Sequence, residues 1–149
     1  MPRARADQSR DVGDLRLSFP AVPESVPALR AAIARFAQEQ GFSQRSLEAI
    51  QLAVSEAASK VVLHAYRLMD QPATIGVSAA CRDNVLMVTV SDAGSGLRPH
   101  PDSPGLGVGL LLISTVADAV EFGRSPAGGL SVQMRFKAQA AESGLQSGC

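Results

Sequence analysis

Residues 91–109, SDAGSGLRPHPDSPGLGVG, interrupt the pattern of the chain more sharply than any other stretch. They contain five glycines and three prolines, a composition typical of a loop. The apolar and β-branched residues from Val85 to Val90 predict a strand before this loop, and the spaced apolar residues from Leu110 to Val120 predict a helix after it. The stretch therefore joins the end of a strand to the start of a helix.

Further strands are predicted on both sides of this junction, because apolar and polar residues alternate there with a period of two. They cover residues 15–19, a segment opened by Pro72 that continues through Ile75, Val77 and Ala79, and residues 130–136. Asp83-Asn84 predicts a turn between two of the strands. Gly128-Gly129 turns the chain into the last strand, which pairs as a hairpin with residues near Val120 to Gly123.

Two helices are predicted between the first two strands. The first begins at a cap formed by Glu24 or Ser25 and ends at Gly41. The second is capped by Ser43 and runs to about Leu68. The order of these elements predicts an α/β two-layer sandwich, with a mixed, mostly antiparallel sheet and helices packed on one face.

The length of 149 residues fits one domain, which we place at residues 15–137 between a disordered arm (1–14) and a flexible tail (138–149). Lys and Arg number 14, as do Asp and Glu, so the chain lacks the positive charge that nucleic-acid binding needs.

Cys81 and Cys149 are too far apart in the sequence to predict a disulfide framework or a zinc site. No apolar run is long enough to span a membrane, and we expect a cytoplasmic protein in a reducing compartment.

Two parts of the glycine-rich stretch have the chemistry of a ligand site. Asp92 follows a strand directly and can accept a hydrogen bond from an exocyclic amine such as that of adenine, while Gly94 and Gly96 leave room for a flat ring. The segment from Gly105 to Gly109 precedes a helix, where backbone N–H groups and the helix dipole favour phosphate. Taken alone, each part is more often a plain connection.

Glu56, Lys60 and His64 are spaced four residues apart in the longer predicted helix and so share one stripe of its surface. Two interpretations are open. The stripe is either a solvated Glu56–Lys60 pair with a surface histidine, or the polar side of a site.

Taken together, these motifs resemble the anti-sigma-factor serine/threonine kinases, a family of the histidine-kinase-like (GHKL) ATPase superfamily. The matching residues are Ser55-Glu56-Ala57, Lys60, His64-Ala65-Tyr66, Asp92-x-Gly94-x-Gly96 and Gly105-x-Gly107-x-Gly109-Leu110. The resemblance implies the Bergerat fold, with ATP or ADP bound between the helix layer and a mobile lid. It also implies a sigma factor and an anti-anti-sigma (STAS-domain) protein as partners, and a homodimer.

The resemblance further implies roles for individual residues. Glu56 is the general base that takes the proton of a partner's serine hydroxyl, and Asp92 binds the adenine amino group. The residues implied to bind nucleotide are Lys60, Asp92, Gly94, Gly96, Gly105, Leu106, Gly107, Val108, Gly109 and Leu110.

The chain departs from the family pattern at three places. Lys60 replaces the asparagine that coordinates Mg²⁺, and an ammonium group cannot ligate a cation, so we assign no residue to a metal. Leu130 replaces a threonine of the adenine site, and Ser131 faces the other side of its strand. Only eight residues, three of them proline, separate Gly96 from Gly105, which predicts a short, stiff lid. Two alternatives to a kinase therefore remain: a module of the same fold that regulates by docking, and a sensor or adaptor domain from a histidine-kinase-like parent.

Overall fold

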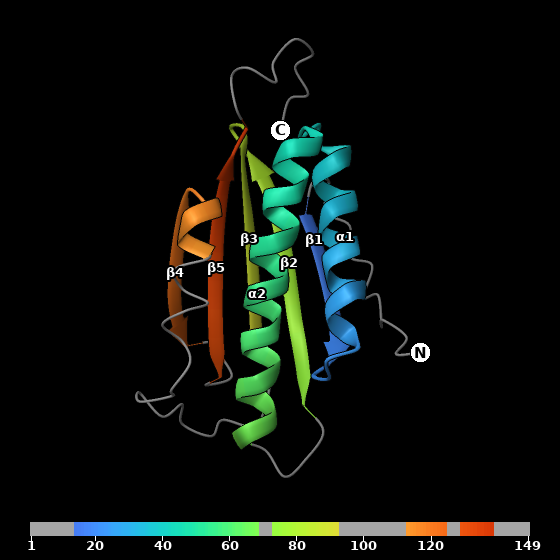
Figure 1. The fold of residues 1–149 in the computed structure, drawn as a ribbon, viewed down its shortest axis with the longest axis vertical. Coiled ribbons are helices and arrows are strands. Elements are labelled where there is room, and N and C mark those ends of the chain that lie inside the picture. The colour runs from blue at the N-terminus through green and yellow to red at the C-terminus, as the bar shows by residue number, and fades with distance from the viewer. Residues whose placement is uncertain (1–13, 69–72, 93–112, 125–128, 139–149) are drawn as a thin grey trace.

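The computed structural model describes residues 14–68, 73–92, 113–124 and 129–138. Five strands form one sheet in the order β1-β2-β3-β5-β4, and each pairing between neighbours is antiparallel. The strands are β1 (Asp14–Pro20), β2 (Thr74–Arg82), β3 (Val85–Asp92), β4 (Ala119–Arg124) and β5 (Leu130–Lys137). The helices α1 (Ser25–Glu39) and α2 (Gln44–Leu68) lie side by side on one face of the sheet (Figure 1). The predicted two-layer sandwich is confirmed.

The ends of the helices follow from local sequence. The Ser43 side-chain oxygen accepts a hydrogen bond of 3.2 Å from the backbone N–H of Ser46, which caps α2 as predicted. Gly41 has a φ of 88°, a left-handed conformation that suits glycine and ends α1. Glu24 stands at the N-cap of α1 but makes no side-chain cap hydrogen bond, and Ser25 is already the first helical residue.

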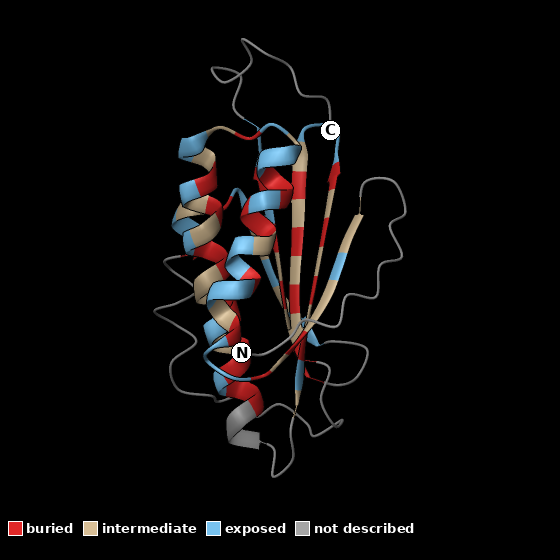
Figure 2. Cartoon of the chain, turned by 90° about the vertical axis from the view of Figure 1, so that its right-hand side faces the viewer, coloured by how far each residue is buried: buried red, intermediate tan, exposed pale blue. Residues whose placement is uncertain are grey.

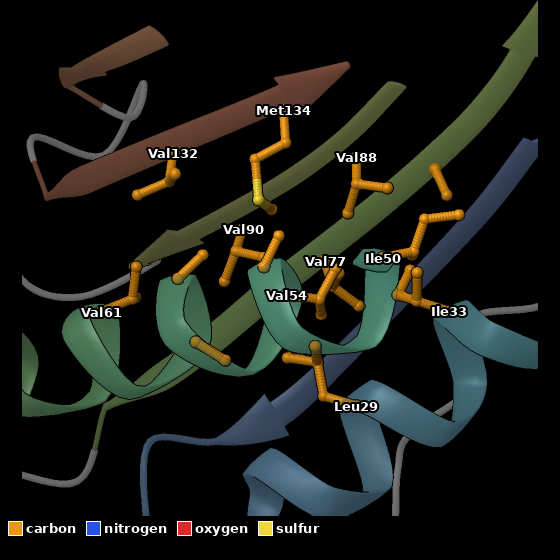
Figure 3. Close-up of a cluster of buried hydrophobic side chains, with 14 of the residues drawn as sticks. Leu29, Ile33, Ile50, Val54, Val61, Val77, Val88, Val90, Val132 and Met134 are labelled. Carbon is orange, nitrogen blue, oxygen red and sulfur yellow. The ribbon is translucent and has the colours of Figure 1, made fainter. Parts of the chain in front are cut away.

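The core lies between the two layers. Buried and half-buried residues alternate along β2 and β3. The helices cover one face of the sheet and no described helix covers the other (Figure 2), so the buried residues are those on the helix-covered face. Figure 3 shows Val77, Val88 and Val90 of the sheet facing Ile50 and Val54 of α2. These side chains are at most 2% exposed, and burial of apolar surface is the main force that holds the layers together.

The turn between β2 and β3 uses two consecutive left-handed residues. Asp83 has a φ of 51° and Asn84 a φ of 63°. This is the conformation of a type I′ turn, whose twist matches that of an antiparallel hairpin. The turn predicted from Asp83-Asn84 is confirmed, and it fixes the register that places Asp92 opposite Ile75.

One predicted element is wrong in its extent. The helix expected from Leu110 to Val120 is helical at residues 113–116 within the part that the structure describes, and β4 begins at Ala119. β4 pairs with β5, with Val120 opposite Met134, which confirms the predicted hairpin. Cross-strand pairing with β5 thus outweighs the helical spacing of the apolar residues at this point.

Cys81 also differs from the prediction. Cys81, near the end of β2, is disulfide-bonded, whereas the sequence predicted no disulfide; the separation of two cysteines along a chain does not reveal their distance in the fold. Cys149 lies outside the described residues, as do the predicted arm and tail apart from Asp14 and Ala138. Within the described ranges, neither helix combines the length and the apolar character that crossing a bilayer requires.

Candidate functional site

Asp92 ends β3 on the sheet face that packs against the helices. The preceding residues on this face, Leu86, Val88 and Val90, are fully buried, so strand alternation places the Asp92 side chain where a further apolar side chain is expected. Asp92 is only 4% exposed, and its partner on β2 is the fully buried Ile75. A carboxylate is costly to bury unless polar groups contact it, so a buried aspartate at the end of an apolar strand face indicates a specific polar role.

Gly129, the residue before β5, lies directly against Asp92. A Cβ atom added at Gly129 would lie 2.7 Å from the Asp92 carbonyl oxygen, 2.8 Å from its Cβ and 2.9 Å from its Cγ. Cβ atoms essentially never approach other heavy atoms so closely. Glycine is therefore required here by close packing on Asp92, in addition to the turn that the sequence predicted.

His64 approaches Asp92 from α2. Its Nδ1 atom lies 3.8 Å from Oδ2 of Asp92, and the two side chains are 8% and 5% exposed. This distance exceeds that of an N–H···O hydrogen bond, and neither ring nitrogen of His64 has a hydrogen-bond partner among the described residues. The interpretation of His64 as a surface histidine is wrong. Its position on the Glu56–Lys60 stripe was the sequence signal for this site, although His64 was not among the predicted nucleotide-binding residues.

Glu56 and Lys60 precede His64 by two turns and one turn on the same stripe of α2, and both are half-buried. At a rise of 1.5 Å per residue, Lys60 lies about 6 Å and Glu56 about 12 Å from His64 along the helix axis. The stripe thus begins at His64, beside Asp92, and continues along α2 for about 12 Å.

Leu130 is the first residue of β5. The next residue, Ser131, pairs with Ser91 of β3, so Leu130 lies beside Asp92. Leu130 is buried and Ser131 is half-buried, in agreement with the predicted opposite orientation of these two side chains. The β5 strand therefore contributes an apolar side chain, with no hydroxyl group, to the face that carries Asp92.

The remaining residues predicted to bind nucleotide lie outside the described part of the chain, and their roles stay predictions. They are Gly94, Gly96, Gly105, Leu106, Gly107, Val108, Gly109 and Leu110.

The described residues fit an adenine base. Asp92 supplies a buried acceptor, Ile75 and Leu130 are apolar neighbours, and His64 carries ring nitrogens that lack described partners. Apolar walls with a few oriented polar groups are typical of small-molecule sites.

Within the described ranges, no cluster of three His, Cys, Asp or Glu side chains could hold a metal ion. Mg²⁺ carried on nucleotide phosphates needs only one or two protein ligands, so this finding does not bear on nucleotide binding.

The chain is similar to known proteins of one family. Residues 19–136 match the histidine kinase-like ATPase domain family. The chain is 30% identical over 122 residues to the serine-protein kinase RsbW of Halalkalibacterium halodurans, covering 72% of this chain and 74% of that protein. It is 29% identical over 121 residues to the serine-protein kinase RsbW of Bacillus licheniformis, covering 71% of this chain and 75% of that protein.

A solved structure shares the fold. The crystal structure of the RsbU and RsbW domains of Rv1364c from Mycobacterium tuberculosis aligns with a TM-score of 0.65 and 21% sequence identity, over 83% of this chain and 32% of that one. With the family match and the relatives above, the resemblance expected from the motifs is confirmed. The chain belongs to the histidine kinase-like ATPase family and, within it, to the anti-sigma-factor serine kinases related to RsbW.

Proposed function

We propose that this protein is an ATP-binding regulator of the anti-sigma-factor type, which binds a sigma factor and phosphorylates a serine of an anti-anti-sigma (STAS-domain) protein in the cytoplasm. Membership of the family supports nucleotide binding, and the relatives are named as serine-protein kinases. The partners and the homodimer are proposed by analogy with that family.

The observation that carries the proposal is the buried carboxylate of Asp92 at the end of an otherwise apolar strand face. Ionised Asp92 is an acceptor only, so it selects a base that presents an amine and disfavours one that presents a carbonyl. Adenine offers an amine at the position where guanine offers a carbonyl. Asp92 therefore favours ATP and ADP over guanine nucleotides.

Glu56 is proposed as the general base. During transfer, the serine hydroxyl oxygen forms a bond to the γ-phosphorus, the bond between that phosphorus and the bridging oxygen breaks, and Glu56 takes the hydroxyl proton. ATP supplies the phosphoryl group and ADP leaves. Catalysis of this type depends mostly on positioning and on neutralisation of charge, and Glu56 lies on the stripe of α2 that ends at His64 and Asp92.

Lys60 favours a second candidate function, a docking module with little or no kinase activity. An ammonium group cannot take the place of a Mg²⁺ ligand, although it can contact phosphate as a point charge. A protein of this kind would bind its partners, with or without nucleotide, and leave the serine unmodified.

Nucleotide titration by calorimetry tests the proposal. We expect ATP and ADP to bind, GTP to bind more weakly, and Asp92→Asn to lower ATP affinity by about 10- to 100-fold, because it removes a charge-assisted acceptor. Glu121→Gln, which removes a carboxylate from an exposed position on β4, is the matched control and should leave affinity unchanged. Absence of ATP binding, or equal affinity of Asp92→Asn and wild type, would contradict the proposal.

A kinase assay then separates the two candidate functions. A purified STAS-domain protein is incubated with γ-labelled ATP and the enzyme, and phosphoserine is measured. Transfer that is lost in Glu56→Gln supports the kinase. Binding of ATP and of the STAS protein without transfer identifies the docking module.

A further inference from the structure

His64 is a buried titratable side chain to which the proposed mechanism gives no role. A neutral imidazole has one N–H donor and one acceptor nitrogen. Neither nitrogen has a hydrogen-bond partner among the described residues, and a buried polar atom without a partner destabilises the folded state. A buried histidine whose ring nitrogens lack described partners needs an explanation, and a function at this site supplies one.

The surroundings of the carboxylate restrict what that function can be. Gly129 packs on Asp92 so closely that even a methyl group would not fit, and Ile75 stands opposite Asp92 on β2. Helix α2 supplies His64, whose Nδ1 lies 3.8 Å from Oδ2. This distance is about 0.6 Å longer than the upper limit of about 3.2 Å for an N–H···O hydrogen bond.

We infer that His64 is a positioning residue for Asp92. In the nucleotide complex, Nδ1–H of His64 donates a hydrogen bond to Oδ2 of Asp92 and fixes the orientation of the carboxylate plane toward the amine of the base. The inference rests on the proposed function, since it needs an adenine nucleotide in the site. It adds that the preference for the amine depends on α2 as well as on β3.

The test uses ATP and purine riboside triphosphate, an analogue that lacks the 6-amino group. The ratio of their affinities isolates the contribution of the amine, which a merely structural role of His64 would not change. We expect wild type to prefer ATP by about tenfold or more, as for a hydrogen bond to a charged acceptor. His64→Phe should reduce this preference close to that of Asp92→Asn.

Two further variants sharpen the result. His64→Asn keeps an N–H donor near the position of Nδ1 and should retain most of the preference. In the double variant His64→Phe/Asp92→Asn, the second change should cause no further loss of preference, because residues that act as a unit are not additive. If His64→Phe does not fold, as judged by circular dichroism, the smaller donor-free His64→Leu replaces it.

The possible outcomes distinguish failure of the inference about His64 from failure of the proposed ATP-binding function. Suppose that wild type prefers ATP, and that His64→Phe and His64→Leu each lower the affinity for ATP and for purine riboside triphosphate by the same factor. His64 then has a packing role and the inference is overturned. If His64→Asn loses the preference as fully as His64→Phe, a donated hydrogen bond is also overturned. If wild type binds neither nucleotide, the proposed function fails and the inference fails with it.

Discussion

Replacement of Gly129 by alanine tests the packing at the end of β3. The added methyl carbon would lie within 2.9 Å of three atoms of Asp92, including the backbone carbonyl oxygen at 2.7 Å. Because one of these atoms is backbone and the others are close to it, the contact cannot be relieved by a flexible side-chain tip. Either the turn before β5 or Asp92 itself must move.

The expected magnitude has two parts. Overpacking of a buried site costs about 1–3 kcal/mol of folding stability. Displacement of Asp92 also removes its hydrogen bond to the base, which lowers ATP affinity by about 10- to 100-fold. Gly129→Ala should therefore lose both stability and affinity, whereas Asp92→Asn should lose mainly affinity.

Gly123→Ala on β4 is the matched control. A Cβ atom at Gly123 would meet nothing within 4 Å, and neither glycine has a positive φ. In urea denaturation the control should be as stable as wild type or more stable by up to about 1 kcal/mol, since alanine lowers the entropy of the unfolded chain. Equal stability and equal ATP affinity of Gly129→Ala and Gly123→Ala would refute the packing described here.

Three further substitutions test other parts of the account. Lys60→Asn should make nucleotide affinity more dependent on Mg²⁺ in calorimetric titrations, because an amide oxygen can ligate the ion; strong Mg²⁺ dependence in wild type would contradict this reading of Lys60. Ser43→Ala should lower the free energy of unfolding by about 0.5–2 kcal/mol through loss of the α2 cap, with unchanged ATP affinity. At the β2–β3 turn, Asn84→Val should cost about 1–3 kcal/mol because a β-branched residue resists positive φ, whereas Asn84→Gly should be tolerated; equal urea midpoints for the two variants would argue against the type I′ turn.

The fold could be predicted from the sequence wherever local signals and tertiary packing agree. Three predicted features depend on neighbours in the chain, and each is present in the structure: the strand from Val85 to Val90, the Asp83-Asn84 turn and the Ser43 cap. The helix predicted from Leu110 to Val120 extends too far, because its apolar spacing fits a helix throughout, whereas pairing with β5 decides the structure from Ala119 onward. The residues that decide this pairing belong to β5 and are not seen in the sequence pattern of residues 110–120.

The site was predictable in its parts but not in its contacts. Asp92 was identified from its place after a strand, but its burial against Gly129 depends on a turn 37 positions later in the chain. The spacing of Glu56, Lys60 and His64 defined a stripe, yet no sequence pattern showed that this stripe ends at the Asp92 carboxylate. The contact between His64 and Asp92 arises from the register of β3 and from the packing of α2 against β3.

A crystal structure of the protein with a non-hydrolysable ATP analogue tests the central claim most directly. The claim is that Asp92, at the end of β3, binds the exocyclic amine of adenine. The prediction is an exocyclic amine within about 2.7–3.2 Å of an Asp92 carboxylate oxygen, with the phosphates extending along the stripe of α2 toward Glu56. An adenine ring bound elsewhere, or an Asp92 side chain without contact to the base, would contradict the account.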